Sequence, residues 1–505
     1  MFKRKLRSLW IALFCTLLIV LNPVRVFGQS TLTVAVEPVY APFEFRNDAG
    51  EIQGFDIDII REIGKAAGFG VRFQTITFAG IIPALQAGTV DAAVGAITIT
   101  PQRSQVVDFS RPYFKAGLAI ATRTNTQNIS SINDLQGKRV AVQIGTTGAL
   151  EAEKIPNAQI RTFNAAVLAL QELSNGNVDA VVHDAPILQY ALNSGGLKNL
   201  RVSDQLLTSE YLGIPTPKGS PNLAKINQGL GTILGNGTYA NIYRKYFNAD
   251  PPQLPETVPN GEQQTRSTNW FTTMQNALPA LLTGTLVTIQ LALISAVIGL
   301  ALGTLLGIIR LSKNRYLRWF ARAYIDFFRG TPLLVQIFMI YFGIPSVIKE
   351  LGLEFNLDRF VAAILALSLN AAAYIAEIVR AGIGSIDVGQ TEAADSLGLD
   401  SRQTLRYIIF PQAFRRMLPP LGNQFISLLK DTTLVAVIGF EELFQRGQLI
   451  VAVNYRPFEL YALVALIYLA LTLLSSQVFS YLERRMNPAQ HKPKENKRDR
   501  VLVQQ

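Results

Sequence analysis

The chain has 505 residues but a single cysteine, Cys15, which lies in an apolar stretch near the N-terminus. Since we expect that stretch to be removed on export, the mature protein would contain no disulfide bond. The sequence also lacks the GxxxxGK[ST] pattern of the loop that cradles phosphates in ATPases. We therefore predict that the chain does not hydrolyse ATP. We predict no enzymatic activity, and we assign no metal and no cofactor.

Charged residues make up only 16% of the sequence, whereas hydrophobic residues make up 49% and the mean hydropathy is +0.24. This composition indicates a membrane protein with a soluble part. The net charge of +11 is unevenly placed, because positive and negative side chains balance over residues 30–250 and the excess lies on either side. The basic excess thus indicates membrane topology, and nucleic acid is not a predicted partner.

Residues 1–29 have the organisation of an export signal. Basic residues precede an apolar run over residues 9–21, and small side chains then occur at Val26 and Gly28, where a signal peptidase reads them. We predict cleavage after Gly28, with an uncleaved membrane anchor as the alternative.

Residues 32–219 alternate between short apolar strands and amphipathic helices. Leu32, Val34 and Val36 have the period of a strand, and the helical face in residues 55–67 leads to another strand at residues 71–73. The alternation continues to residue 182, which predicts an α/β domain with a mainly parallel sheet. Ligands of such sheets lie beyond the carboxyl ends of the strands.

Side chains suited to an amino acid are expected at those strand ends. Thr100 is placed to cap a helix that begins at Pro101, which puts Arg103 in the first turn beside free backbone N–H groups. A guanidinium in that position suits a carboxylate. Asp184 follows the strand at residues 178–182 and suits an ammonium group. With the donors at the helix start near Thr147, these groups would bind an α-amino acid.

Each of these side chains also has an ordinary structural explanation. Asp184 is placed to cap the following helix, and Arg103 to form a surface ion pair. Tyr40 and Phe78 would be core aromatics, and His183 a packed residue beside the site. The joint occurrence of these residues at strand ends favours the binding site.

Several motifs resemble those of the periplasmic binding proteins that capture polar amino acids. The resemblance covers residues 32–247, and its motifs lie at residues 40–45, 54–58, 78–85, 97–110, 145–147 and 179–184. It implies two lobes joined by crossing segments near residues 115–120 and 211–217. A ligand that contacts both lobes would favour their closed arrangement.

The resemblance also assigns roles toward the backbone of an amino acid. Arg103 and Thr98 would hold the α-carboxylate together with the backbone at Ala96, and Thr147 would add an amide. Asp184 would hold the α-ammonium.

The side chain of the ligand would lie between Tyr40 and Phe78, with Glu37 facing its far end. A carboxylate there suits a cation or an amide donor. At the position of Gln143, the glutamine-specific members of this family resemble one another in having a lysine. The predicted ligands are therefore basic amino acids, glutamine or both.

Residues 249–269 contain several prolines among polar residues and are predicted to form an extended tether. Five apolar segments follow, each long enough to span a membrane, at residues 277–309, 320–344, 360–378, 419–440 and 460–482. Lys and Arg gather in residues 310–329, in residues 380–416 and after residue 482. The positive-inside rule places these loops in the cytoplasm and the N-terminal domain on the opposite side.

A polar stretch at residues 392–411 must emerge from the membrane between two of these segments. It is predicted to form two short helices separated at Gly398, with Asp400 or Ser401 capping the second. The stretch resembles the EAA loop of ATP-binding-cassette importer permeases. The matching residues are Glu392, Ala393, Ala394, Gly398, Ile408 and Pro411. The resemblance implies a cytoplasmic helix that docks on a separate ATPase.

We therefore predict a two-lobed α/β binding-protein fold followed by an all-α transmembrane permease domain of about five helices. The predicted boundaries are a signal peptide at 1–29, an amino-acid-binding domain at 30–248, a linker at 249–269, a permease domain at 270–486 with the coupling loop at 392–411, and a basic cytoplasmic tail at 487–505. The resemblance implies one subunit of an importer of polar amino acids in a bacterial inner membrane. Its partners would be membrane lipid, an ATPase dimer and a second permease copy.

Two other classes use the same binding fold. An amino-acid-gated channel has its pore inserted within the lobes, whereas here both lobes precede the first apolar segment. An exported enzyme such as a dehydratase needs an acid or base in the cleft, for which Glu37 and His183 are the candidate pair. That enzyme would leave the apolar segments unexplained.

Overall fold

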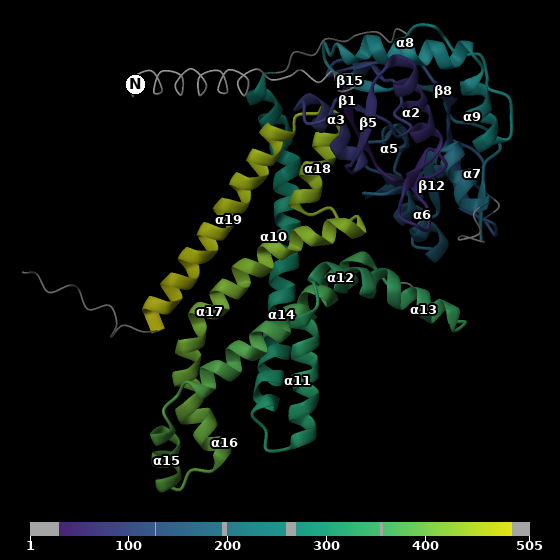
Figure 1. Cartoon of the computed structure of the whole chain (residues 1–505). Coiled ribbons are helices and arrows are strands. Elements are labelled where there is room, and N and C mark those ends of the chain that lie inside the picture. The colour runs from purple at the N-terminus through teal and green to yellow at the C-terminus, as the bar shows by residue number, and fades with distance from the viewer. Residues whose placement is uncertain (1–29, 127, 194–198, 259–268, 354–356, 487–505) are drawn as a thin grey trace, which may run out of the picture.

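The structure is a computed structural model and describes residues 30–126, 128–193, 199–258, 269–353 and 357–486. The predicted signal peptide and basic tail lie outside the described residues, as does the second half of the predicted linker. Figure 1 shows an α/β domain that ends with α9 and a bundle of long helices that begins with α10.

The first lobe is built on a three-stranded parallel sheet in the order β5-β1-β6. Its strands are β1 (Thr31–Val36), β5 (Gly70–Thr75) and β6 (Ala92–Ala93). A small antiparallel sheet contains β2 (Val39–Tyr40), β3 (Glu44–Arg46) and β4 (Ile52–Gln53). The helices are α2 (Phe55–Ala67), α3 (Phe78–Gln86), α4 (Pro101–Ser104), α8 (Asn222–Gly235) and α9 (Thr238–Phe247). Apolar side chains of β1, α2, α8 and α9 form one buried core.

The second lobe has a five-stranded sheet in the order β11-β10-β12-β9-β13. The strands are β9 (Leu118–Arg123), β10 (Arg139–Gln143), β11 (Gln159–Phe163), β12 (Ala180–Asp184) and β13 (Leu200–Val202). Its helices are η1 (Ile132–Leu135), α5 (Thr147–Ala152), α6 (Ala166–Asn175) and α7 (Ala185–Asn193). The predicted parallel pairing is confirmed for β10 with β11 and β12, whereas β9 is antiparallel to both of its neighbours. The first residue of β9, Leu118, pairs with the last residue of β12, Asp184, so the two strands run in opposite directions.

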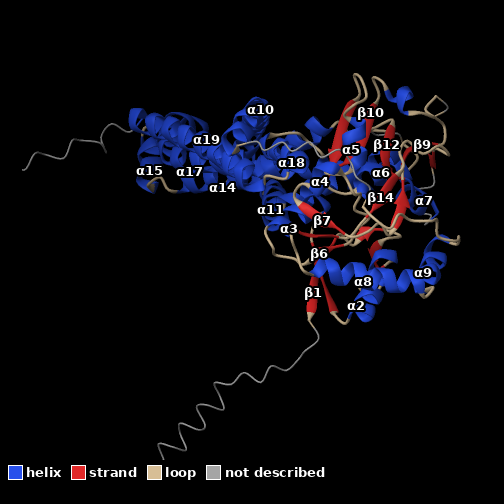
Figure 2. Ribbon diagram, turned by 90° about the horizontal axis from the view of Figure 1, so that it is seen from above, coloured by secondary structure: helices blue, strands red, loops and turns tan. Residues whose placement is uncertain are grey.

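Two strand pairs connect the lobes. β8 (Phe114–Ala116) pairs with β14 (Glu210–Leu212), and β7 (Val107–Phe109) pairs with β15 (Pro215–Pro217). The pairing of β8 with β14 places parts of the two predicted crossing segments side by side. In Figure 2, seen from above, β7 and β14 lie between the helices α5 and α6 on one side and α8 and α9 on the other.

The second part of the chain is helical. Its long helices are α10 (Trp270–Arg310), α11 (Arg315–Gly330), α14 (Arg359–Gly384), α17 (Phe410–Asp431) and α19 (Pro457–Met486). Shorter helices are α12 (Leu333–Phe338), η2 (Met339–Gly343), α13 (Ile344–Glu350), α15 (Val388–Ser396), α16 (Ser401–Gln403), η3 (Thr404–Ile409), η4 (Thr432–Ile438) and α18 (Leu443–Asn454). α10 packs along α14, where glycines face alanines.

Within the described residues, α10, α14 and α19 are long and apolar enough to cross a membrane. α11 and the helix that follows it make a fourth candidate, bent by 105°. These helices coincide with four of the five predicted segments. The segment predicted at residues 419–440 instead covers the end of α17 and η4, and neither of these helices is among the candidate spans of the described residues.

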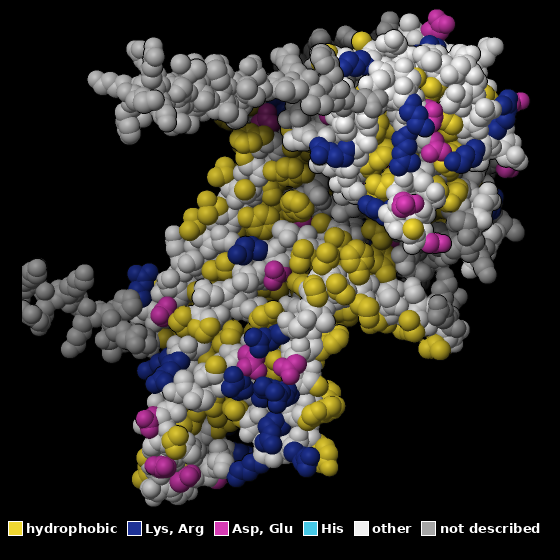
Figure 3. Space-filling view, viewed as in Figure 1, with side chains coloured by type: hydrophobic (Ala, Val, Ile, Leu, Met, Phe, Trp, Pro, Cys, Tyr) yellow, Lys and Arg dark blue, Asp and Glu magenta, His cyan; other side chains and the backbone are white. Residues whose placement is uncertain are grey.

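The two polar ends of the molecule lie far apart. Figure 1 shows α15 and α16 at the end of the helical bundle opposite the α/β domain. In Figure 3, hydrophobic side chains cover much of the bundle between these ends, and Lys and Arg side chains gather toward the end that carries α15.

Candidate functional site

Arg103 lies in the cleft between the lobes, as its helix start predicts. The Thr100 side chain accepts a hydrogen bond from the Arg103 backbone N–H, and Pro101 opens α4. The Arg103 side chain is only 3% exposed. Its guanidinium donates to the carbonyl of Thr98 at 2.7 Å and to that of Gly145 in the second lobe at 2.8 Å. The surface ion pair considered for Arg103 is not formed among the described residues.

Asp184 ends β12 on the opposite side of the cleft and is 4% exposed. Its Oδ2 accepts a hydrogen bond from the Tyr40 hydroxyl of the first lobe at 2.8 Å. Its Oδ1 has no hydrogen-bond partner among the described residues. A buried carboxylate oxygen without a donor is costly, so this atom is able to accept a further hydrogen bond or a cation.

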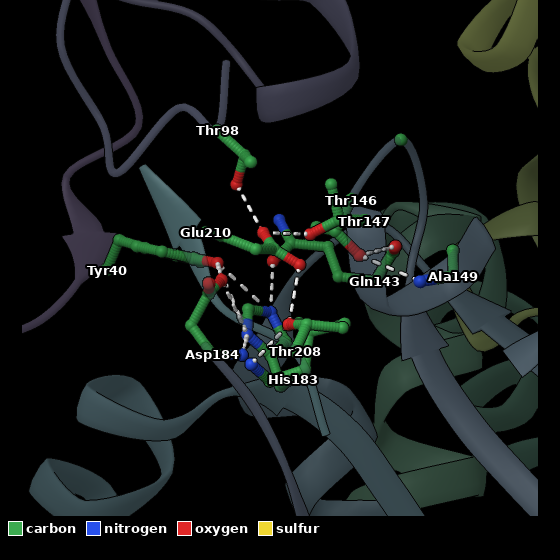
Figure 4. A network of polar contacts seen from close by, with 12 residues as sticks. Tyr40, Thr98, Gln143, Thr146, Thr147, Ala149, His183, Asp184, Thr208 and Glu210 are labelled. Atoms are coloured by element: carbon green, nitrogen blue, oxygen red, sulfur yellow. Dashed lines mark hydrogen bonds and ion pairs between the residues drawn. The ribbon is translucent and has the colours of Figure 1, made fainter. Parts of the chain in front are cut away.

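Glu37, Gln143 and His183 form a buried chain of contacts, and Figure 4 shows Gln143 and His183 near Asp184. Gln143 Nε2 donates to Glu37 Oε2 at 2.9 Å, and Gln143 Oε1 lies 3.1 Å from Nε2 of His183. The Tyr40 hydroxyl also contacts His183. Burial raises the pKa of the Glu37 carboxyl to about 7, and hydrogen bonds from the Phe78 backbone and from Gln143 partly offset this rise. His183 is therefore packed within the site, in agreement with the structural explanation considered for it.

Tyr40 and Phe78 present nearly parallel rings. Their centroids are 6.2 Å apart and their planes differ by 12°. The guanidinium carbon of Arg103 lies 5.5 Å from the Phe78 ring centroid. Aromatic faces in this position suit a planar guanidinium or amide group, or the stem of a long side chain.

Thr98 and Thr147 face each other from the two lobes, but their hydroxyls bind a protein carboxylate. Both donate to Oε2 of Glu210 at 2.8 Å, and Thr208 donates to Oε1 at 2.9 Å. Figure 4 shows Glu210 between these residues, near His183 and Asp184. Burial and the nearby Asp184 raise the pKa of Glu210, and the hydrogen bonds from the three threonine hydroxyls partly offset this rise.

Sequence reasoning missed Glu210. The only local signal is an acidic residue at the start of the second crossing segment, and an acidic residue in a loop is usually solvated. Its partners Thr98 and Thr147 are 112 and 63 residues away.

Ala96 turns its N–H away from the cleft. It has a positive φ of 48°, and its N–H donates to Oδ2 of Asp56 at 2.9 Å, as does that of Gly95 at 2.8 Å. Asp56 is fully buried, and burial raises the pKa of its carboxyl to about 6. In this arrangement Ala96 shapes the turn that precedes Thr98 and offers no free N–H to a ligand.

The coupling stretch has the predicted two-helix form at the far end of the bundle. α15 ends at Ser396, and Gly398 has a left-handed φ of 75°. Asp400 caps α16 by accepting the N–H groups of Arg402 and Gln403, each at 2.8 Å. The helix then passes through a π-helical turn at η3 into α17, with Pro411 in its first turn. Glu392, Ala393 and Leu397 are exposed, whereas Ala394 is buried.

Two family models match separate parts of the chain. Residues 32–249 match the bacterial extracellular solute-binding proteins, family 3. Residues 299–488 match the binding-protein-dependent transport system inner membrane component.

Curated relatives match the helical part. The glutamine transport system permease protein GlnP of Escherichia coli is 42% identical over 210 residues, which is 42% of this chain and 94% of the relative. The arginine transport system permease protein ArtQ of Bacillus subtilis is 39% identical over 209 residues, 41% of this chain and 93% of the relative. Among solved structures, an ancestral arginine-binding protein bound to arginine is 38% identical with a TM-score of 0.42, covering 43% of this chain and 98% of that one.

Proposed function

Since the chain belongs to the permease family of binding-protein-dependent amino-acid transporters and carries a family 3 solute-binding domain in the same polypeptide, we propose that it captures a basic amino acid or glutamine outside the membrane and passes it through its own helices. The observation that carries this proposal is the pairing, in one buried cleft, of a guanidinium with spare donors and a carboxylate oxygen without a donor.

Arg103 supplies the carboxylate contact. A guanidinium has five N–H donors, and three acceptors contact Arg103 among the described residues. N–H groups on both Nη atoms therefore remain for a ligand. Thr98 and Thr147 add polar walls whose hydroxyls are fixed by Glu210.

Asp184 supplies the ammonium contact through its unpartnered Oδ1. Because Asp184 belongs to the second lobe and Arg103 to the first, an amino acid that binds both holds the two lobes together. This is the differential contact that makes a ligand favour the closed form.

The far end of the cleft favours a cation. Carboxyl groups in this part of the domain repel one another: in addition to burial, Asp56, Glu37 and Asp184 raise the pKa of the buried Glu44, and Asp184 raises that of the half-buried Glu210. A positive charge beside Glu37 would relieve their mutual repulsion, so arginine and lysine are the favoured substrates. Glutamine is the second candidate, because its amide can donate to Glu37 at lower electrostatic gain.

At the other end, the exposed face of α15 would receive a separate ATPase, with the N-terminal α/β domain on the opposite side of a bacterial inner membrane. The proposed assembly contains two copies of the permease and two ATPase subunits. Its support is the distance between α15 and the α/β domain in Figure 1, together with the helix caps of the coupling stretch.

The test is calorimetric titration of the full chain in lipid nanodiscs with L-arginine, L-lysine, L-glutamine and L-citrulline. Citrulline has the shape of arginine without its charge, so we expect arginine to bind most tightly and citrulline to behave like glutamine. Arg103→Ala and Asp184→Ala should each weaken binding by roughly 30-fold or more, as removal of one partner of a buried charge pair does. Arg72→Ala, on the outer face of the first lobe, is the control.

If folded wild-type chain binds none of the four, the proposed substrate class is wrong. If Arg103→Ala binds as wild type does, the carboxylate assignment is wrong.

A further inference from the structure

A residue of the membrane part contacts the arginine of the amino-acid site. Nε of Arg103 donates to the hydroxyl of Tyr455 at 3.4 Å, across a separation of 352 residues in the sequence. Tyr455 is buried and belongs to the same apolar cluster as Phe78 and Ile81 of the first lobe. The site therefore includes a side chain that the α/β domain itself does not contain.

The end of α18 is shaped to place Tyr455 in the cleft. Tyr455 follows the last turn of this helix with a left-handed φ of 55°, and its N–H donates to the carbonyl of Val451 at 2.8 Å. A bulky residue in this conformation is strained and persists only where surrounding contacts hold it. Tyr455 is held by the apolar cluster that it shares with Phe78 and Ile81 and by its hydrogen bond with Arg103.

The same helix also contacts the second lobe. A Cβ atom built on Gly145 would lie 3.7 Å from Cβ of Ala452. Phe78, Arg103, Gly145, Ala452 and Tyr455 line a remaining space of only about 10 Å³, which is room for about one water molecule. Both lobes therefore pack closely on the last turn of α18.

The other end of α18 is fixed to two long helices. The buried carboxylate of Glu442 caps it by accepting the N–H groups of Phe444 and Gln445 at 2.9 and 2.8 Å. The same carboxylate accepts from the hydroxyls of Tyr468 in α19 at 2.8 Å and Thr288 in α10 at 3.4 Å. A movement of α10 or α19 is thus transmitted by α18 to Tyr455.

We infer that Tyr455 is a positioning residue through which the membrane helices weaken the hold of Arg103 on the carboxylate of the bound amino acid. This inference rests on the function proposed above. The tyrosine hydroxyl accepts from Nε of Arg103 and the ligand carboxylate would accept from the Nη atoms, so the two acceptors share the positive charge of one guanidinium. The carboxylate is the stronger acceptor, so Tyr455 lowers the affinity and speeds release without blocking binding.

The test is dissociation of radiolabelled L-arginine from the full chain in nanodiscs. Tyr455→Phe keeps the ring that packs on Phe78 and removes only the hydroxyl. We expect dissociation about fivefold slower, with a correspondingly lower Kd, from loss of one competing hydrogen bond. Tyr481→Phe, the same substitution on an exposed residue of α19, should leave the rate unchanged.

An unchanged or faster rate in Tyr455→Phe would overturn the inference, because a residue that only packs or only orients Arg103 gives those results. If wild-type chain binds neither arginine nor glutamine, the proposed function fails instead, so the two failures are distinguishable.

A second measurement tests the contact itself. In a Cys15→Ser background, which removes the only native cysteine, Gly145→Cys combined with Ala452→Cys places two Cβ atoms at a separation suited to a disulfide. We expect a cross-link on mild oxidation, and none when Gly145→Cys is paired with Ala470→Cys in α19. A folded chain that does not cross-link the first pair overturns the inference.

Discussion

Single residues in the cleft are notable for their buried carboxyl groups. Burial raises the pKa of Glu37 to about 7 and of Asp56 to about 6. A carboxyl whose pKa is higher in the folded state stabilises the fold fully below its unfolded pKa, near 4, and this contribution is lost as pH rises to about 7. At low pH protons therefore offset the cost of these buried charges, and under the proposed function a cationic ligand would take over that role at neutral pH.

Arginine affinity should consequently depend on pH through Glu37. Between pH 8 and pH 6 the Glu37 carboxyl gains a proton, so we expect arginine to bind about tenfold more weakly at pH 6, as one pKa unit of coupling implies, while glutamine binding changes little. Calorimetry at pH 6, 7 and 8 measures both. Glu37→Gln should remove the pH dependence of arginine binding, and its persistence in this variant would contradict the assignment.

Glu210 is expected to link the lobes through the threonine hydroxyls that it accepts. Glu210→Gln replaces one carboxylate oxygen with an N–H₂ group that cannot accept from Thr98, Thr147 or Thr208. We expect a lower unfolding temperature and arginine affinity reduced by roughly tenfold, measured by calorimetry on the same sample. Glu62→Gln is the control, because Glu62 only pairs with the exposed Lys65. Equal behaviour of the two variants would show that Glu210 has no such role.

Among the secondary-structure elements, α10 and α14 pack closely against each other. Gly299, Gly303 and Gly307 recur every four residues on one face of α10, and a Cβ at Gly303 would lie 2.7 Å from both the carbonyl oxygen of Ala372 and Cβ of Ile375. Small residues at this spacing allow helix backbones to approach closely in a membrane. The two helices can therefore pack this closely only because these three positions of α10 are glycines.

Gly303→Ala should destabilise the bundle. The added methyl group overpacks the contact with α14, at a cost of roughly 1–3 kcal/mol, which we expect to appear as a lower unfolding temperature in detergent. Gly330→Ala is the matched control, since nothing lies within 4 Å of a Cβ there, and alanine favours a helix. Similar unfolding temperatures for the two variants would contradict close packing at Gly303.

At the scale of the whole molecule, the membrane helices contact both lobes. The end of α18 meets the first lobe at Tyr455 and the second lobe at Ala452, which faces Gly145. The second lobe also meets η2 and η4, where the Tyr341 hydroxyl donates to the buried Glu172 of α6 at 2.5 Å and Gly439 packs on the backbone of Thr162. A change in the separation of the lobes therefore has to move at least one of these contacts.

Tyr341→Phe should loosen the contact of η2 with α6 alone. Its loss leaves one oxygen of Glu172 buried without a donor, a cost of roughly 1–3 kcal/mol. We expect faster hydrogen exchange of the backbone of α6, measured by mass spectrometry on the full chain, with arginine affinity unchanged. Tyr316→Phe, at an exposed site on α11, should not alter the exchange. Unaltered exchange in Tyr341→Phe would show that this contact does not hold the lobe.

The features that the sequence alone determined depend on neighbours within a few residues. Thr100, Pro101 and Arg103 set their helix start, Asp400 and Gly398 set the two helices of the coupling stretch, and apolar length marked four membrane segments. These features follow from local capping, backbone and hydropathy rules, which require no knowledge of the fold.

The tertiary structure decided which distant groups meet. Glu210 occupies the hydroxyls of Thr98 and Thr147, Asp56 takes the N–H of Ala96, and Tyr455 reaches Arg103. The partners of these hydrogen bonds lie between 40 and 352 residues apart. A hydrogen bond depends on the distance between two atoms in space, and the pattern of residues along the chain does not encode that distance. The sequence therefore predicted candidate residues for an amino-acid site, and the fold decided which other groups contact them.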